Sequence, residues 1–149
     1  MRLTAVVCRS AVAQQWAKDT LPDTVRVCPS ADQLYDYAEE FDAVLVVTPH
    51  KTHPALVMQA FAHGKHVLCD KPSANALAPA LEMNRAAEKS GLVFAMMFHQ
   101  RRYKKYMRLK KLLDDGALGE IKRVQLENSR YFRTWMYHRS GSWRSSWAG

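Results

Sequence analysis

A charged pair followed by proline, Asp70-Lys71-Pro72, ends a short apolar run near the middle of the chain. The run, His66–Cys69, predicts a buried strand, and Pro72 cannot continue a ladder of backbone hydrogen bonds. Proline also favours an extended conformation at Lys71. Because ligands of open α/β sheets sit at the carboxyl ends of the strands, Asp70 and Lys71 are candidates to face a ligand. The alternative is an ordinary strand end with two solvated charges.

Two H-x-x-H pairs, His50/His53 and His63/His66, could be taken for a zinc site with Cys69 nearby. The first pair opens an expected helix, and the second pair straddles its far end. At ~1.5 Å of rise per residue, the two pairs lie roughly 15 Å apart. They are too far apart to share one ion, so we predict no metal site.

Strand-like and helix-like segments alternate five times in the first 100 residues. This alternation is typical of right-handed βαβ units around a parallel sheet, so we predict an α/β fold. The expected strands cover residues 3–8, 25–28, 43–47, 66–69 and 92–98, and the expected helices cover residues 11–19, 30–40, 54–63, 76–90 and 103–114.

Two local expectations accompany this pattern. Ser10 can cap the first helix, with Trp16 on the inner face of that helix. Residues 121–131 alternate well enough for a further, half-exposed strand.

The composition is that of a folded domain, with 48% hydrophobic and 24% charged residues. One chain of 149 residues suits one domain, with no room for two large ones. No apolar run approaches the ~20 residues of a membrane span, and the run at the N-terminus is too short for a signal peptide. Cys8, Cys28 and Cys69 lie in strand-like segments, which favours buried thiols and a cytoplasmic location.

Positive charge is concentrated in the last third of the chain. Residues 1–98 contain nine Lys and Arg and ten Asp and Glu, whereas residues 99–149 contain thirteen and four. A basic patch could bind nucleic acid or another anion. We favour a solvated helix face at residues 102–111 over nucleic-acid binding.

Four segments together resemble the Gfo/Idh/MocA oxidoreductases, the family of glucose–fructose oxidoreductase and inositol dehydrogenase. Their order and spacing agree over nearly the whole chain. The family usually has Glu-Lys-Pro where this chain has Asp70-Lys71-Pro72, a change that keeps the charge. The segments are DAVLVVTPHKTH (42–53), GKHVLCDKP (64–72), GALGEI (116–121) and GSWRSSWAG (141–149).

The resemblance implies a Rossmann-type doubly wound parallel sheet over residues 1–119, then the beginning of an α+β C-terminal domain at 120–149. Family members open with a strand and a G-x-G-x-x-G turn, which this sequence lacks. The chain is therefore expected to begin at the second strand of the sheet. In the order 3-2-1-4-5-6 the first strand is central. Strands 3–8 and 43–47 would then pair directly, leave a gap, or receive a strand from another chain.

The resemblance also implies roles for Asp70-Lys71-Pro72 and for the loop after the third expected strand. Lys71 matches the catalytic lysine, which hydrogen-bonds the reacting hydroxyl or carbonyl and stabilises negative charge on that oxygen. The loop after the third strand matches the segment that passes the nicotinamide side of the cofactor, although its residues could equally serve as a helix start. The implied cofactor-binding residues here are Thr48, Pro49, His50, His53, Asp70, Lys71 and Pro72.

Further candidates follow the second and sixth strands of the family sheet. Arg9 and Ser10 stand where an acidic residue would bind the ribose 2′-OH of NAD, and Arg can accommodate a 2′-phosphate. We therefore expect NADP, with NAD possible; the alternative is a capping serine beside an exposed arginine. Where the family usually has Asn-x-Arg, this chain has His99-Gln100-Arg101. The implied substrate-facing residues are His99 and Arg101, and a Trp-Arg pair that approaches the cofactor in relatives is matched by Trp143 and Arg144.

The implied function is hydride transfer between a nicotinamide cofactor and a sugar, cyclitol or related metabolite, in an enzyme that is a possible homo-oligomer. Without the glycine-rich turn and most of a second domain, we expect this chain alone to be inactive. The alternative from a different class is a non-catalytic fragment that acts only as a binding or oligomerisation module.

Overall fold

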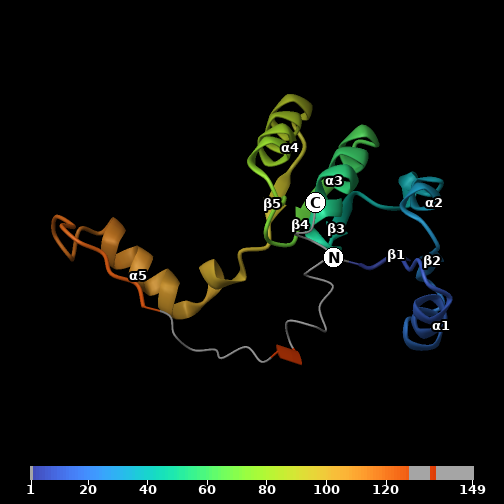
Figure 1. Cartoon of the computed structure of the whole chain (residues 1–149), viewed down its shortest axis with the longest axis horizontal. Coiled ribbons are helices and arrows are strands. Elements are labelled where there is room, and N and C mark those ends of the chain that lie inside the picture. The colour runs from blue at the N-terminus through green and yellow to red at the C-terminus, as the bar shows by residue number, and fades with distance from the viewer. Residues whose placement is uncertain (1, 128–134, 137–149) are drawn as a thin grey trace.

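The computed structural model describes residues 2–127 and 135–136, and in this part of the chain five strands form two parallel sheets (Figure 1). The strands are β1 (Ala5–Val7), β2 (Arg26–Cys28), β3 (Ala43–Val46), β4 (His66–Cys69) and β5 (Phe94–Met96). The helices are α1 (Ala11–Thr20), α2 (Ala31–Tyr35), α3 (His53–Ala62), α4 (Leu77–Ser90) and α5 (Lys104–Asp114), with short 3₁₀ turns η1 (Ala38–Glu40), η2 (His50–Thr52) and η3 (His99–Arg102).

Helix ends follow local sequence signals. Ser10 and Ser30 cap α1 and α2, because each hydroxyl accepts a hydrogen bond from the backbone N–H three residues later. Pro54 lies in the first turn of α3, where its missing N–H leaves no hydrogen bond unmade. Gly91 ends α4 with φ +68°, a left-handed conformation that glycine adopts without steric cost.

The strand order is β2-β1 in one sheet and β3-β4-β5 in the other, with parallel pairing throughout. The expected α/β class is confirmed, and the order corresponds to the doubly wound arrangement without a strand between β1 and β3. Helix α1 lies on the opposite side of the molecule from α3 and α4 (Figure 1). Of the three possibilities for the gap, direct pairing is not the one observed, because β1 and β3 do not pair in the described residues.

The hydrogen-bond pattern defines which backbone groups face the gap. Cys8 N–H donates to Cys28 in β2, and Arg26 N–H donates to Thr4, so alternate residues of β1 are bonded to β2. Ala5 and Val7 then direct their N–H and C=O groups the other way. The same alternation in β3, where His66 N–H donates to Asp42, directs Ala43 and Leu45 away from β4. Among residues 2–127, one sheet therefore has an unpaired edge at β1 and the other has an unpaired edge at β3.

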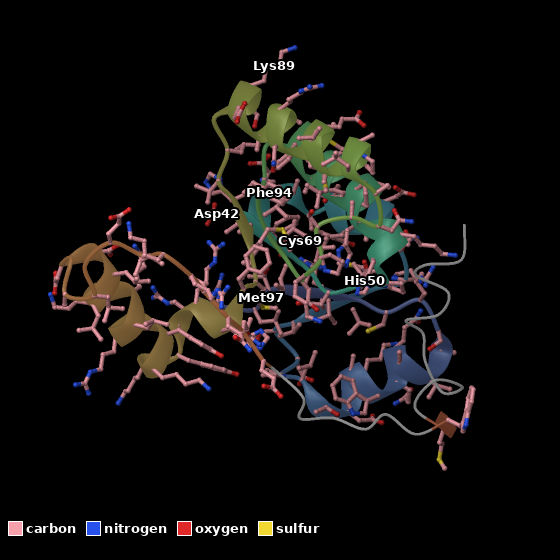
Figure 2. All side chains as sticks on the ribbon, turned by 60° about the vertical axis from the view of Figure 1, so that its left-hand side comes forward. Asp42, His50, Cys69, Lys89, Phe94 and Met97 are labelled. Carbon is pink, nitrogen blue, oxygen red and sulfur yellow. The ribbon has the colours of Figure 1, made fainter. Side chains whose placement is uncertain are left out.

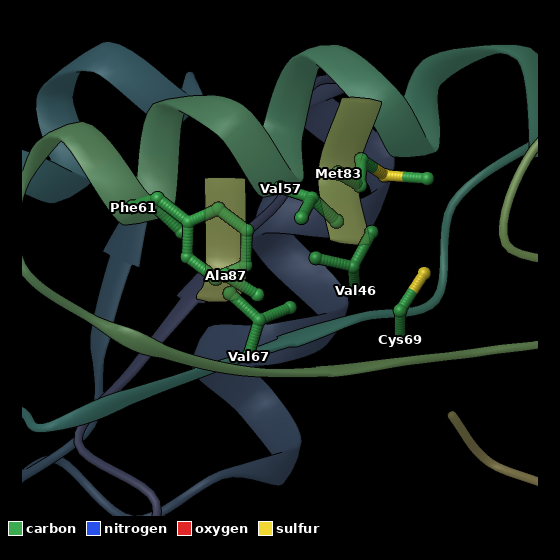
Figure 3. Close-up of a cluster of buried hydrophobic side chains, with 8 residues drawn as sticks. Val46, Val57, Phe61, Val67, Cys69, Met83 and Ala87 are labelled. Atoms are coloured by element: carbon green, nitrogen blue, oxygen red, sulfur yellow. The ribbon is translucent and has the colours of Figure 1, made fainter. Parts of the chain in front are cut away.

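The main core lies between the three-stranded sheet and the helices α3 and α4 (Figure 3). Alternate residues of β3 and β4 point into it, and the residue at the centre of α4, Met83, is fully buried. Each such apolar side chain contributes about 1.5–3 kcal/mol on burial. The buried cluster consists of Val46, Val57, Ala60, Phe61, Val67, Cys69, Met83 and Ala87.

Two local expectations are wrong. Trp16 is 61% exposed, because α1 packs on β2 through Ala17. Trp16 is the residue before Ala17, so its side chain points about 100° away round the helix. Residues 121–127 form no strand, and Val124 and Leu126 are exposed without a neighbouring strand to pair with. The remainder of that expected strand, 128–131, lies outside the described residues.

Helix α5 contacts η3 and buries none of its own residues. It extends away from the sheets in Figure 1. Lys110 and Lys111 form ion pairs with Asp114 and Asp115 one turn later, at 2.8 and 2.7 Å. In the described part of the chain, no helix is both long and apolar enough to cross a membrane.

We predict that amide hydrogen exchange distinguishes the N–H groups that face the gap from those bonded within the sheets. Val6 and Val44 donate their N–H groups within the sheets, whereas those of Val7 and Leu45 face the gap. The N–H groups of Val7 and Leu45 should exchange at least about tenfold faster than those of Val6 and Val44. Equal protection of each neighbouring pair would mean that another strand covers the gap.

Candidate functional site

The carboxyl ends of β3, β4 and β5 lie side by side at one edge of the three-stranded sheet. Asp70 N–H donates to the Val46 carbonyl at 2.8 Å, and Met97 N–H donates to the Cys69 carbonyl at 2.8 Å. In Figure 2, His50 and Met97 lie lower than Asp42 and Phe94, which are at the opposite ends of the strands, and Lys89, in α4, lies at the top of the view. The strand-end location expected for Asp70 and Lys71 is therefore the observed one.

The loop after β3 is held by a chain of hydroxyl hydrogen bonds. The Thr52 hydroxyl donates to the Pro49 carbonyl at 2.7 Å, and the Thr48 and Thr52 hydroxyl oxygens are 2.7 Å apart. Because the Thr52 proton is already donated to Pro49, the Thr48 hydroxyl must donate to Thr52. The exposed Thr48 oxygen is therefore left with acceptor capacity, which suits a ligand group that carries N–H or O–H donors.

His53 joins this loop to the turn that follows β4. Its side chain is fully buried, with Nδ1 2.9 Å from the Pro72 carbonyl oxygen and Nε2 2.7 Å from the Thr48 carbonyl oxygen. The His53 side chain is buried against these two carbonyls, and the cofactor-binding role expected for this residue stays a prediction. The ring connects the loop after β3 to the turn after β4.

The Asp70-Lys71-Pro72 turn leaves the Lys71 side chain exposed. Lys71 N–H donates to Asp70 Oδ1 at 2.8 Å, and the Lys71–Pro72 peptide bond is cis. Burial, followed by the positive charges of His53 and Lys71, lowers the pKa of His50, and Asp70 opposes this effect. Lys71 is thus an exposed cation at this edge, and the pKa of the neighbouring His50 is lowered.

Arg9 and Ser10 follow β1, in the other sheet, at the carboxyl end of that strand. The Ser10 hydroxyl accepts a hydrogen bond from Ala13 N–H at 3.2 Å, so it serves as a helix cap. Arg9 is exposed. These two residues therefore belong to a different sheet from the strand that leads into the Thr48 loop.

His99 and Arg101 belong to η3, which is separated from the end of β5 by Met97 and Phe98. Their contacts are local: the His99 ring is 5.8 Å from the Tyr103 ring, and the Arg101 guanidinium lies 4.9 Å from the centre of the Phe98 ring. The structure places both residues beyond the strand end, and their substrate role stays a prediction. Trp143 and Arg144 lie outside the described residues.

The sequence pattern did not indicate a role for Thr52, which precedes His53 and Pro54 at the start of α3. Thr52 makes no cap hydrogen bond and instead orients the Thr48 hydroxyl. The Thr-x-x-x-Thr spacing around Pro49 was the available signal, since a single turn brings these two positions together.

Within the described residues, no group of three or more His, Cys, Asp or Glu side chains is arranged to hold a metal ion. Cys28 and Cys69 are buried free thiols, and Cys8 is half-buried. Burial, with a smaller effect of Asp70, raises the pKa of Cys69 to about 11.

Comparisons with known proteins agree with this geometry. A model of an oxidoreductase family with an NAD-binding Rossmann fold matches residues 2–98. An uncharacterised oxidoreductase of Schizosaccharomyces pombe is 30% identical over 136 residues, which are 91% of this chain and 36% of that protein. An inositol 2-dehydrogenase of Streptomyces avermitilis is 42% identical over 79 residues, which are 52% of this chain and 23% of that protein.

Among solved structures, the scyllo-inositol dehydrogenase of Lactobacillus casei with bound NAD(H) and scyllo-inositol superposes with a TM-score of 0.72. It is 27% identical to this chain and is matched over 80% of this chain and 35% of its own length. The chain thus spans about a quarter to a third of the length of these relatives.

We predict that thiol labelling distinguishes Cys8 from Cys69. At about pH 8 only roughly one in a thousand Cys69 side chains would be a thiolate, since its pKa is raised to about 11. Cys8 should be labelled first, and Cys69 only on unfolding, as mass spectrometry of labelled peptides can measure. A Cys8→Ser variant serves as the control, and rapid labelling of Cys69 in the folded chain would contradict the buried position of β4.

Proposed function

The chain belongs to the Gfo/Idh/MocA family of oxidoreductases, and we propose that it forms the nicotinamide side of the cofactor site in an NAD(P)-dependent enzyme. The observation that carries this proposal is the position of Lys71. It emerges at the carboxyl end of β4, next to the loop after β3, where open α/β sheets bind their ligands. The chain spans only part of its relatives, so the activity is proposed for the whole enzyme.

Lys71 is the proposed catalytic residue. A bound nicotinamide supplies a carbon that accepts or donates hydride. As hydride leaves or reaches the substrate carbon, negative charge develops on the attached oxygen, and the Lys71 ammonium can donate a hydrogen bond to that oxygen. Asp70 fixes the backbone of Lys71 through its carboxylate, which directs the exposed side chain.

The residues of the β3 loop fit a nicotinamide nucleotide as the neighbouring ligand. Thr48 offers an acceptor oxygen, because its own proton is donated to Thr52. The carboxamide and the ribose of a nicotinamide nucleotide carry N–H and O–H donors that such an oxygen can bind. We propose Thr48, Pro49 and His50 as the lining of this side of the cofactor.

We propose NADP as the preferred cofactor. The segment that follows β1 carries Arg9 and no carboxylate, and Ser10 is engaged in capping α1. An exposed guanidinium can pair with a 2′-phosphate in a bidentate manner, whereas the ribose 2′-OH of NAD is usually bound by an acid.

The proposed substrate is a polyhydroxylated metabolite such as a sugar or a cyclitol. Support comes from relatives that are inositol 2-dehydrogenases and from the solved scyllo-inositol dehydrogenase. His99 and Arg101 are proposed to approach such a substrate, since they follow the strand next to β4.

A second candidate function is that of a binding or oligomerisation module. The exposed apolar stripe of α5 favours it, because unpartnered apolar surface on a helix marks an interaction site. The stripe consists of Tyr106, Leu109, Leu112 and Leu113. A nucleic-acid surface is less favoured, since Lys110 and Lys111 are paired with aspartates of the same helix.

We predict that this chain binds NADP weakly, through the nicotinamide side of the cofactor and not through its pyrophosphate. The sequence contains no G-x-G-x-x-G turn to bind the pyrophosphate, and phosphate contacts supply much of the anchoring in such sites. The dissociation constant should be no tighter than about 1 mM, or about −4 kcal/mol. In an NMR titration, the amides of Thr48 and Lys71 should shift, and those of α5 should not. Shifts confined to α5 would reject the proposed site.

The proposed preference for NADP can be tested with Arg9→Asp. Replacing the guanidinium by a carboxylate should weaken NADP binding and spare or improve NAD binding, because the carboxylate repels a 2′-phosphate. The ratio of the two dissociation constants should change by about tenfold or more. Lys89→Asp, which makes the same change of charge at the far end of α4, is the matched control. An unchanged ratio in Arg9→Asp would overturn the assignment of this residue.

A further inference from the structure

His53 occupies an unusual hydrogen-bonding position for a histidine. Its side chain is fully buried, and each ring nitrogen lies within hydrogen-bond distance of a backbone carbonyl. Nδ1 is 2.9 Å from the Pro72 oxygen, and Nε2 is 2.7 Å from the Thr48 oxygen. A carbonyl oxygen can only accept, so each of these contacts needs a proton on the ring nitrogen.

A neutral imidazole carries a proton on one nitrogen and a lone pair on the other. In this position a neutral ring would leave one carbonyl facing a bare nitrogen, away from water. Only the imidazolium donates to both carbonyls. We propose that His53 is a positioning residue that donates from both ring nitrogens and so clamps the Lys71 turn against the Thr48 loop.

The clamp acts on both sides of Lys71. The Lys71 N–H is bound by the Asp70 carboxylate, and the next carbonyl in the chain, that of Pro72, is bound by His53. The other end of the clamp holds the Thr48 carbonyl, whose residue carries the hydroxyl that is oriented towards Thr52. The ring therefore fixes the position of the exposed ammonium relative to the exposed hydroxyl.

Several elements around His53 carry ionisable groups. From η2, the His50 ring lies 5.7 Å away at a steep angle, and burial lowers the pKa of His50; Lys51 of the same turn is exposed. The end of β4 contributes Cys69, Asp70 and Lys71, and β3 contributes no ionisable group. The ionisable residues of α4 are all exposed; they are Glu82, Arg85, Glu88 and Lys89.

His66 supplies a matched control within the same chain. Its Nδ1 accepts a hydrogen bond from Val93 N–H at 3.0 Å, so this nitrogen must be bare while the bond holds. The two histidines therefore require opposite states at Nδ1. They lie in one sheet-and-helix unit, which removes differences of solution conditions from the comparison.

The protonation of both rings can be read from long-range ¹H–¹⁵N spectra of the chain labelled at histidine. In the folded chain we expect protons on both nitrogens of His53, and a bare Nδ1 at His66. A bare nitrogen at His53 under these conditions would overturn the proposal. The spectra need no cofactor, so this outcome is independent of whether the proposed oxidoreductase function is correct.

The positioning role itself is tested by a pH titration from about pH 5 to about pH 9. The ¹³C signal of the Pro72 carbonyl and the amide signal of Ser73 should move together with the loss of a His53 ring proton. In His53→Gln, which keeps amide N–H donors on one atom only, the same signals should be flat. Movement that is unrelated to the His53 ring would reject the clamp. If His53→Gln fails to fold, the titration of the unmodified chain still decides.

The consequence for the reaction rests on the proposed function of Lys71 and is measured separately. In the titration with NADP, His53→Gln should reduce the shift of the Lys71 amide, and Lys89→Ala should leave it unchanged. No response of Lys71 to NADP in the unmodified chain would count against the oxidoreductase proposal alone, because the ring spectra would still report the clamp.

Discussion

The site depends on one constraint, which is that β4 is bonded on both sides by parallel strands. Its residues alternate between β3 and β5 as partners, so Asp70 N–H reaches the Val46 carbonyl, and the Cys69 carbonyl accepts from Met97 N–H. The hydrogen bonds on both sides fix the register of β4, and so the position of its carboxyl end relative to β3 and β5. The charged turn that follows it must lie between the loops after β3 and β5, and the apolar core beneath it fixes the depth.

Much of the fold was predictable because local and tertiary preferences agree in these segments. Apolar runs bounded by proline or glycine identified β3 and β4 within a residue or two, and the regular alternation indicated parallel pairing. Trp16 and residues 121–127 failed for a shared reason: an apolar pattern indicates a buried face only where another element covers that face. Neither segment has such a cover in the described residues.

The candidate site divides in the same way. Lys71 was predictable, because a proline directly after a strand marks where the strand ends. The burial of His53 was not, since a histidine before Pro54 at a helix start is usually solvated. Its partners come from Thr48 and from Pro72, which lies nineteen positions later in the chain, and only the packing of α3 on β4 brings them together. The assignments of Arg9, His99 and Arg101 remain proposals.

The open gap between the two sheets has a consequence for cooperativity. Residues 43–96 contain the whole buried cluster, whereas β1, α1 and β2 bury little more than Ala17 and Cys28. In the described residues the two sheets share no strand, so loss of the β1–β2 unit would expose almost none of the larger core. Thermal unfolding should therefore proceed in two steps, with the β1–β2 unit melting first and the calorimetric enthalpy exceeding the van't Hoff value.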